Sequence, residues 1–301
     1  MGLLTPAAPT LPGVATEVLT SIYQHRLLST AQAHAMHTPG RTRRWAEHVL
    51  AQLASRGLTA FVRPGRGGPR LYYLTLAGAQ AVELVPTRVE TRRKLITAEQ
   101  AAGPLWRHTL AVNDTGIAFM QAARERGDDF GPFGWRHEIA HHAPSAGHAR
   151  GELLISDALL TYLAFGPGDE LTFHYRLLEL DRATVPTDTL AGKLARYADL
   201  YRHTPTNGQP PGKPAWRARY PIFPDIICVL AGQPRASLQR RAQTVLALCR
   251  EDPRLQRTPE VRVSLALLED LQARGPFAPV WRQPTDPSQT LDWLGRPPGA
   301  R

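Results

Sequence analysis

The sequence predicts a two-domain protein of the α+β / α/β class. Its 301 residues correspond to about two domains of ordinary size, and a hydrophobic content of 43% is enough for a core in each. Helical periodicity in the first part gives way to two short strands around a glycine-rich turn. The second part alternates strands and helices in the order αβββαβ, and its last strand is apolar almost throughout.

Composition points to a polyanionic partner. The formal net charge is +10 and the isoelectric point is near 10.2, which favours nucleic acid first and a membrane surface second. The sequence has neither a long apolar run nor a basic-then-apolar N-terminal signal, so we expect a cytoplasmic protein without membrane contact. Cys228 and Cys249 have no metal-binding spacing and are expected as buried thiols. The absence of a GxxxxGK[ST] motif argues against an ATPase.

The first domain is expected over residues 14–84, after a disordered lead at residues 1–13. Three helices are expected, at residues 14–28, 30–37 and 42–56. Either Ser29 or Thr30 fits the N-cap of the second helix, and Gly57 ends the third. The apolar stripe of the third helix consists of Trp45, Val49, Leu50 and Leu53.

Residues 58–83 follow as strand, turn, strand and helix. The turn, from Pro64 to Pro69, is rich in glycine, and the helix begins near Thr75. Three helices followed by a two-stranded ribbon form the pattern of a winged helix-turn-helix. The segment LYYLTLAG resembles the second wing strand and the following helix of many bacterial winged-helix domains.

Arginines gather where such a domain contacts DNA. Residues 41–70 contain one acidic residue, Glu47, and seven arginines, at positions 41, 43, 44, 56, 63, 66 and 70. Arg41, Arg43 and Arg44 fall at the start of the recognition helix, which enters the major groove. Arg63, Arg66 and Arg70 fall on the wing, where they suit phosphates or the minor groove. We expect double-stranded DNA as partner; the alternative is a protein-binding winged helix with a solvated basic face.

A basic connector at residues 85–97 separates the two domains. It contains Arg88, Arg92, Arg93 and Lys94. The second domain is expected over residues 98–275. The Pro-rich residues 276–301 are expected to form a tail that wraps the surface, with Trp281 and Trp293 isolated in it.

Two strands of the second domain carry carboxylates on the same face as the apolar side chains that are expected in the core. Because side chains alternate along a strand, Leu153, Ile155, Asp157 and Leu159 share one face of the first. On the second strand the shared face holds Phe173, Tyr175, Leu177, Glu179 and Asp181. An ionised carboxylate in such a row is costly unless a cation or a donor meets it, which makes it a candidate catalytic or metal site.

The following helix brings a lysine toward these acids. Its apolar stripe consists of Leu190, Leu194, Tyr197 and Tyr201. Lys193 lies at the edge of this stripe, where its ammonium can reach back to the strands. The candidate catalytic residues are therefore Asp157, Glu179, Asp181 and Lys193. The alternative is a structural ion pair between Lys193 and Asp181 or a nearby surface acid.

The order αβββαβ matches the restriction-endonuclease-like, PD-(D/E)xK fold. In that fold two carboxylates hold Mg²⁺, which activates water for attack on a phosphate. Asp157 and Glu179 match these metal ligands, with Glu138 as a further outer ligand. The sequence departs from the motif at Asp181, where lysine is usual, and Lys193 is expected to supply that charge. A zinc site at His137, His141, His142 and His148 is the weaker alternative, because no cysteine joins them.

Several short motifs resemble the replication-relaxation family of plasmids and integrated elements. They are HTLAVND at residues 108–114, Trp135 with Glu138, SDA at 156–158, ELDR at 179–182, KLARY at 193–197 and the strand before Gly232. The resemblance covers roughly residues 14–250, and the usual proline before the aspartate is Ser156 here. It implies a role in plasmid replication, DNA relaxation or transfer.

Three functional hypotheses follow from these observations. The first is a DNA-binding protein of a mobile element, which combines a winged helix with a nuclease-like domain. The second is a Mg²⁺-dependent endonuclease, or nickase, that uses Asp157, Glu179 and Lys193. The third is a winged-helix transcriptional regulator whose second domain dimerises. A homodimer and the replication or relaxosome proteins are the expected protein partners.

Overall fold

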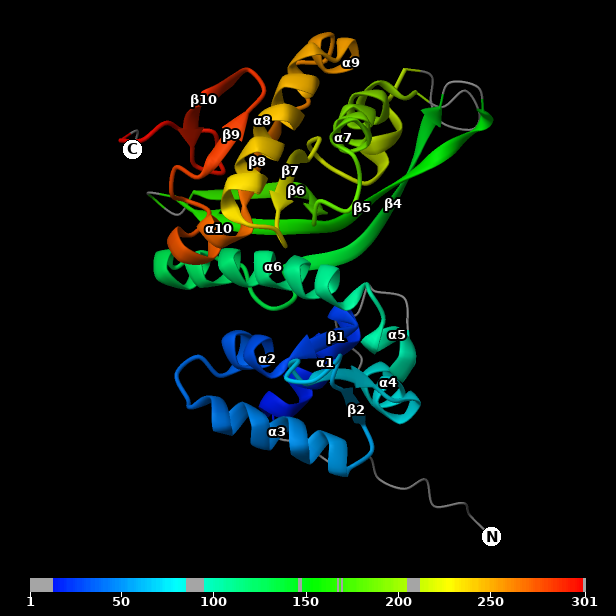
Figure 1. Ribbon diagram of the computed structural model, residues 1–301, viewed down its shortest axis with the longest axis vertical. Helices are drawn as coiled ribbons and strands as arrows, with labels where there is room; N and C mark the ends of the chain where they lie inside the picture. Colours follow the sequence, from blue (N-terminus) through cyan, green and yellow to red (C-terminus); the bar gives the residue numbers. More distant parts are fainter. Residues whose placement is uncertain are drawn as a thin grey trace. The chain divides into compact units, whose positions relative to one another are not determined.

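The computed structural model describes residues 13–84, 95–145, 148–166, 168, 170–204 and 212–299 (Figure 1). The chain forms two compact units, Met1–Asn113 and Asp114–Arg301, and the division falls inside helix α6. Residues 1–12 of the predicted lead and most of the predicted connector lie outside the described residues, whereas Gly13, also predicted in the lead, is the first residue of α1 (Gly13–His25). Within the described residues, no helix has the length and apolar character that crossing a membrane requires.

The first unit combines helices with a small antiparallel sheet. Its elements are α1 (Gly13–His25), β1 (Leu27–Ser29), α2 (Thr30–His37), α3 (Arg43–Ser55), β2 (Thr59–Val62), β3 (Leu71–Leu74), α4 (Leu76–Glu83), α5 (Ala98–Ala102) and the start of α6 (Trp106–Arg126). The strand order is β1-β3-β2, and both pairings are antiparallel. The mixed α+β class is thus confirmed for this unit.

Strand β1 corrects the expected first helix. That helix was predicted to reach residue 28, but α1 ends at His25, and Arg26 adopts a left-handed backbone with φ 71°. The next residues are extended because they pair with β3, in the register Leu27↔Tyr73 to Ser29↔Leu71. Ser29 then caps α2: its side chain accepts from the backbone N–H of Gln32, and the Gln32 side chain accepts from the backbone N–H of Ser29.

The second unit is built on a seven-stranded mixed sheet with the order β10-β9-β8-β7-β6-β5-β4. The strands are β4 (Trp135–Ser145), β5 (His148–Phe165), β6 (Leu171–Asp181), β7 (Asp225–Leu230), β8 (Val263–Leu267), β9 (Trp281–Gln283) and β10 (Asp286–Leu291). The helices, besides α6, are α7 (Thr187–Arg202), the 3-10 helix η2 (Ala215–Ala218), α8 (Arg235–Glu251), α9 (Pro253–Gln256) and α10 (Leu268–Arg274). Neighbours among β6, β7 and β8 are parallel, and the other pairs are antiparallel.

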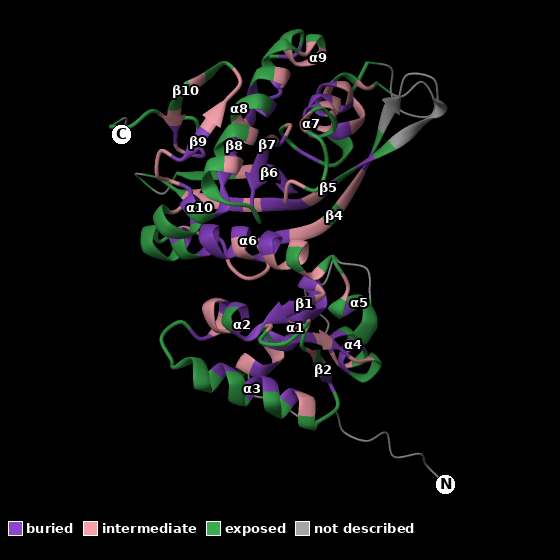
Figure 2. Cartoon of the chain, viewed as in Figure 1, coloured by how far each residue is buried: buried purple, intermediate pink, exposed green. Residues whose placement is uncertain are grey.

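Both faces of this sheet are covered in its centre. Helices α7 and α8 lie on one face and α6 on the other (Figure 1). Strand β7 is buried from Ile226 to Leu230, as its apolar sequence predicts for a strand covered on both sides (Figure 2). One apolar cluster of this unit includes Leu177 on β6, Leu194 on α7 and Val245 on α8.

The predicted core row of β5 is wrong in its outer part. Leu153 and Ile155 are 49% and 43% exposed, whereas Leu154 and Ser156 are fully buried. Leu154 belongs to the cluster that packs with α7 and α8. Alternation in the sequence shows which residues share a face, but not which face another layer covers. Phe173 on β6, predicted as core, is likewise half exposed.

The C-terminal residues also depart from the prediction of a surface tail. They contribute β9 and β10 to the sheet, and both of their tryptophans are buried. The rings of Trp281 and Trp293 lie 6.4 and 5.2 Å from that of Phe119 on α6. These three rings form an aromatic cluster from which water is excluded, so the C-terminal segment belongs to the core of the second unit.

Candidate functional site

The exposed side of α3 carries arginines at its first turn. The helix begins at Arg43 after the N-cap Thr42, and it buries Ala46, Val49, Leu50 and Leu53. Trp45, predicted in the apolar stripe, is 37% exposed because Ala46 takes the inward position. Arg41, Arg43 and Arg44 are therefore all exposed at the start of this helix.

A hollow of about 370 Å³ lies between α3 and the turn that joins β2 to β3. It is lined by Thr30, Arg43, Glu47, Arg63, Gly67, Gly68, Pro69 and Arg70. We call it the α3–turn hollow. Three of the six predicted DNA-binding arginines, Arg43, Arg63 and Arg70, thus meet around one depression. The others, Arg41, Arg44 and Arg66, are exposed on the same unit.

Glycines shape the turn that forms one wall of this hollow. Gly65 and Gly67 adopt φ values of 80° and 77°, a left-handed backbone that favours glycine. On the other wall Arg43 approaches Glu47 one helical turn later, with 3.8 Å between Nε and Oε1. The Arg70 guanidinium lies over the Phe61 ring, 5.2 Å from its centre. The local charge is cationic, because three arginines face one carboxylate.

In the second unit, Glu179 is held by two side chains of α7. Lys193 Nζ donates to Oε2 and the Tyr197 hydroxyl donates to Oε1, each at 2.5 Å. Glu179 is almost fully buried, whereas the Lys193 side chain is 34% exposed. The predicted reach of Lys193 from α7 to the strand acids is thus present in the structure. Tyr197 was expected only as a core residue of the helix stripe, and its hydroxyl contact was missed.

Burial dominates the electrostatics of this carboxylate. The pKa of Glu179 is raised to about 8, first by burial and then by the nearby Asp157, while Lys193 and Tyr197 act in the opposite direction. Burial also raises the pKa of the Tyr197 phenol well above its ordinary value. Burial thus favours the protonated form of Glu179, and Tyr197 stays neutral.

Asp157 and Asp181 have different surroundings. The half-buried Asp157 accepts a hydrogen bond from the backbone N–H of Leu180 on the adjacent strand, at 2.7 Å. Asp181 instead pairs with Arg241 on α8 through both carboxylate oxygens, at 2.5 and 3.1 Å. Arg241 also donates to the Val185 carbonyl at 2.6 Å. The structure thus groups Asp157, Glu179 and Lys193 and directs Asp181 to a separate ion pair.

This donor set does not fit a divalent metal ion as it stands. In the described ranges, no group of three or more His, Cys, Asp or Glu side chains is arranged to hold a metal. Each oxygen of Glu179 already accepts a protein hydrogen bond, and the Lys193 ammonium beside it repels a cation, so Mg²⁺ at Glu179 would compete with these contacts. Glu138, considered as an outer ligand, is exposed and has a left-handed backbone with φ 52°.

Among the histidines whose side chains the structure describes, no metal site forms either. His141 is buried, and its Nε2 lies 2.7 Å from the Tyr220 hydroxyl. Burial lowers the pKa of His141 to about 4, with a smaller contribution from Arg219, so the ring is neutral. His142 is exposed, and the side chain of His148 lies outside the described residues. His141 is therefore a buried side chain of β4.

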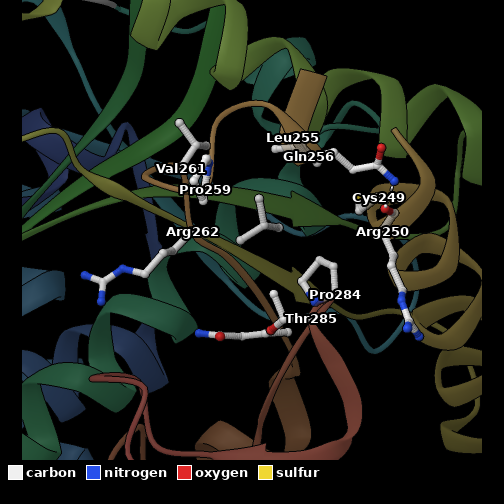
Figure 3. Close-up of a pocket in the computed structure, with 11 residues that line it drawn as sticks. Cys249, Arg250, Leu255, Gln256, Pro259, Val261, Arg262, Pro284 and Thr285 are labelled. Carbon is white, nitrogen blue, oxygen red and sulfur yellow. Dashed lines mark hydrogen bonds between the residues drawn. The ribbon is translucent and has the colours of Figure 1, made fainter. Parts of the chain in front are cut away.

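A separate cavity of about 220 Å³ lies beside the end of α8 (Figure 3). Its lining is mainly apolar and includes Cys249, Leu255, Val261 and Pro284. Arg262, at its rim, forms two hydrogen bonds with Asp225, at 2.9 and 2.8 Å. The residues that line this cavity were not predicted as a site; Cys249 among them is buried, as expected.

Comparison with known proteins places the chain in a family. The family model described as Replication-relaxation matches residues 19–212, which is more than half of the chain. Neither the curated proteins nor the solved structures that were compared give a match. The matched range contains α3, the α3–turn hollow, Asp157, Glu179 and Lys193. The chain therefore belongs to the replication-relaxation family.

Proposed function

We propose that this chain is a DNA-binding protein that acts in the replication, relaxation or transfer of a plasmid or integrated element. Its family membership supports a role in replication or relaxation. The observation that carries the DNA-binding part is the gathering of arginines on the exposed side of α3 and on the adjacent turn. In this proposal the first unit is a winged helix that docks on duplex DNA.

The positions of the arginines separate those that suit base contacts from those that suit backbone or minor-groove contacts. Exposed side chains in the first turn of a recognition helix reach base edges in the major groove, a role that suits Arg44. Arginines on the turn between β2 and β3 follow the phosphate backbone or the minor groove, which suits Arg63, Arg66 and Arg70. Binding then depends strongly on salt, because each neutralised phosphate releases counterions.

Substitution of the first-turn arginines tests this proposal. Arg43→Ala/Arg44→Ala is expected to weaken duplex binding. The plot of log K against log salt is also expected to become less steep, by about 0.9 for each phosphate that is no longer neutralised. Arg56→Ala is the matched control, because Arg56 is also exposed but lies at the other end of α3. An unchanged affinity and an unchanged slope in the double variant refute the assignment of α3 to DNA.

A second candidate function is a Mg²⁺-dependent endonuclease on a restriction-endonuclease-like second unit. It is favoured by one observation: Lys193 contacts Glu179 beside Asp157, which matches the residue types of that motif. The Lys193 ammonium and the Tyr197 hydroxyl that already contact Glu179 argue against it, so we rank it below DNA binding. The test incubates a supercoiled plasmid with the protein and Mg²⁺ or Mn²⁺. Nicking that is abolished by Asp157→Ala supports the endonuclease, and a plasmid that stays supercoiled refutes it.

A further inference from the structure

We propose that the α3–turn hollow binds one backbone phosphodiester of DNA, and that Glu47 is a built-in competitor that limits the affinity of this contact. The proposal deepens the proposed function, because it assigns a ligand group to one part of the same surface. It assigns Arg43 to the backbone together with the wing arginines and leaves base reading to other positions of α3.

The hollow has the chemistry of a phosphate site. It brings together guanidinium side chains from three separate segments, Arg43 on α3, Arg63 after β2 and Arg70 before β3. A guanidinium presents a planar fork of N–H donors that matches phosphate oxygens. The remaining lining is small or polar, with Thr30, Gly67 and Gly68, so an anion can approach without a bulky side chain in its way.

Glu47 is the residue that makes this inference specific. It lines the same hollow as the three arginines and pairs with Arg43 at 3.8 Å. The side chains of Glu47 and Arg43 are 49% and 61% exposed, so water screens this ion pair and it is weak. Arg43 can therefore exchange Glu47 for a phosphate at low cost. The carboxylate left behind repels that phosphate, which reduces the net gain from binding.

The test measures binding of the full chain to two duplexes of unrelated sequence over a range of salt concentrations. Arg63→Gln and Arg70→Gln are each expected to weaken binding roughly tenfold, by the loss of a charge-assisted hydrogen bond, and by the same factor on both duplexes. Because three arginines share one phosphate, each single variant is expected to reduce the magnitude of the salt slope by less than the value of about 0.9 that loss of the whole contact would give. Glu47→Gln is expected to strengthen binding to both duplexes, and most at low salt.

Arg56→Gln is the matched control, since it removes an exposed arginine of the same unit outside the hollow. A thermal melt of each variant establishes that it is folded before binding is compared. The inference is overturned if Arg63→Gln and Arg70→Gln behave like the control, or if Glu47→Gln weakens binding. In that case the proposed function still stands if Arg44→Ala reduces affinity. Failure of the unmodified chain to bind any duplex at low salt overturns both.

Discussion

Removal of the Lys193 ammonium tests how the buried carboxylate of Glu179 is tolerated. Lys193→Met keeps most of the apolar stem but removes the donor to Oε2. Breaking a buried ion pair costs about 3–5 kcal/mol. Lys193 is 34% exposed and the Tyr197 hydrogen bond to Oε1 remains, so we expect about 2 kcal/mol at pH 9, where Glu179 is ionised. At pH 6, where the carboxyl is protonated, we expect about 1 kcal/mol or less.

The pH dependence has a definite sign. The folded pKa of Glu179, about 8, exceeds its ordinary value of 4.5, so the folded protein binds this proton more tightly than the unfolded chain does. The stabilisation that comes from this bound proton is fully present below pH 4.5 and is lost as pH rises through 8. In the middle of this window the loss is about 1.4 kcal/mol per pH unit. Glu179→Gln is expected to remove it.

Urea denaturation followed by tryptophan fluorescence, at pH 6, 7.5 and 9, measures these free energies of unfolding. Arg202→Met is the matched control on the same helix, because Arg202 forms a surface ion pair with Asp199, at 3.0 Å. The double variant Lys193→Met/Glu179→Gln completes a cycle that isolates the coupling between the two side chains. The reasoning is refuted if Lys193→Met costs no more than the control at pH 9, or if its cost does not change with pH.

Three further predictions concern packing and the buried His141. Trp293→Ala is expected to destabilise the second unit by about 3–5 kcal/mol in the same urea assay, since its ring is buried in the aromatic cluster; a cost below about 1 kcal/mol contradicts this. Gly78→Ala is expected to lower the melting temperature, because a Cβ there overlaps the Leu58 carbonyl oxygen, whereas Gly40→Ala, with nothing within 4 Å, leaves it unchanged. The folded pKa of His141, about 4, lies below the ordinary 6.5, so its contribution to stability is present above pH 6.5 and is lost as pH falls toward 4. His141→Phe is expected to reduce that acid sensitivity in pH-dependent melts, and an unchanged profile contradicts the assignment.

Local pattern in the sequence was sufficient for the mixed α+β class and for much of the site. The helical period located α3 and α7, and the apolar run located β7. The clustering of arginine near α3 identified the basic surface, because charge density along a short segment survives folding as charge density on one unit. The reach of Lys193 to the strand acids followed from its place at the edge of the α7 stripe.

Tertiary structure decided which partner each of these residues meets. The sequence pattern puts Asp181 and Glu179 on one strand face. In the structure, however, Asp181 forms an ion pair with Arg241, which lies sixty residues later on α8. Leu154 is buried and Leu153 is not because of what covers β5, and Trp293 is core because the chain returns to α6. A period of two or 3.6 residues encodes which side chains share a face. Which layer covers that face depends on contacts between distant segments, and these exist only once the chain has folded.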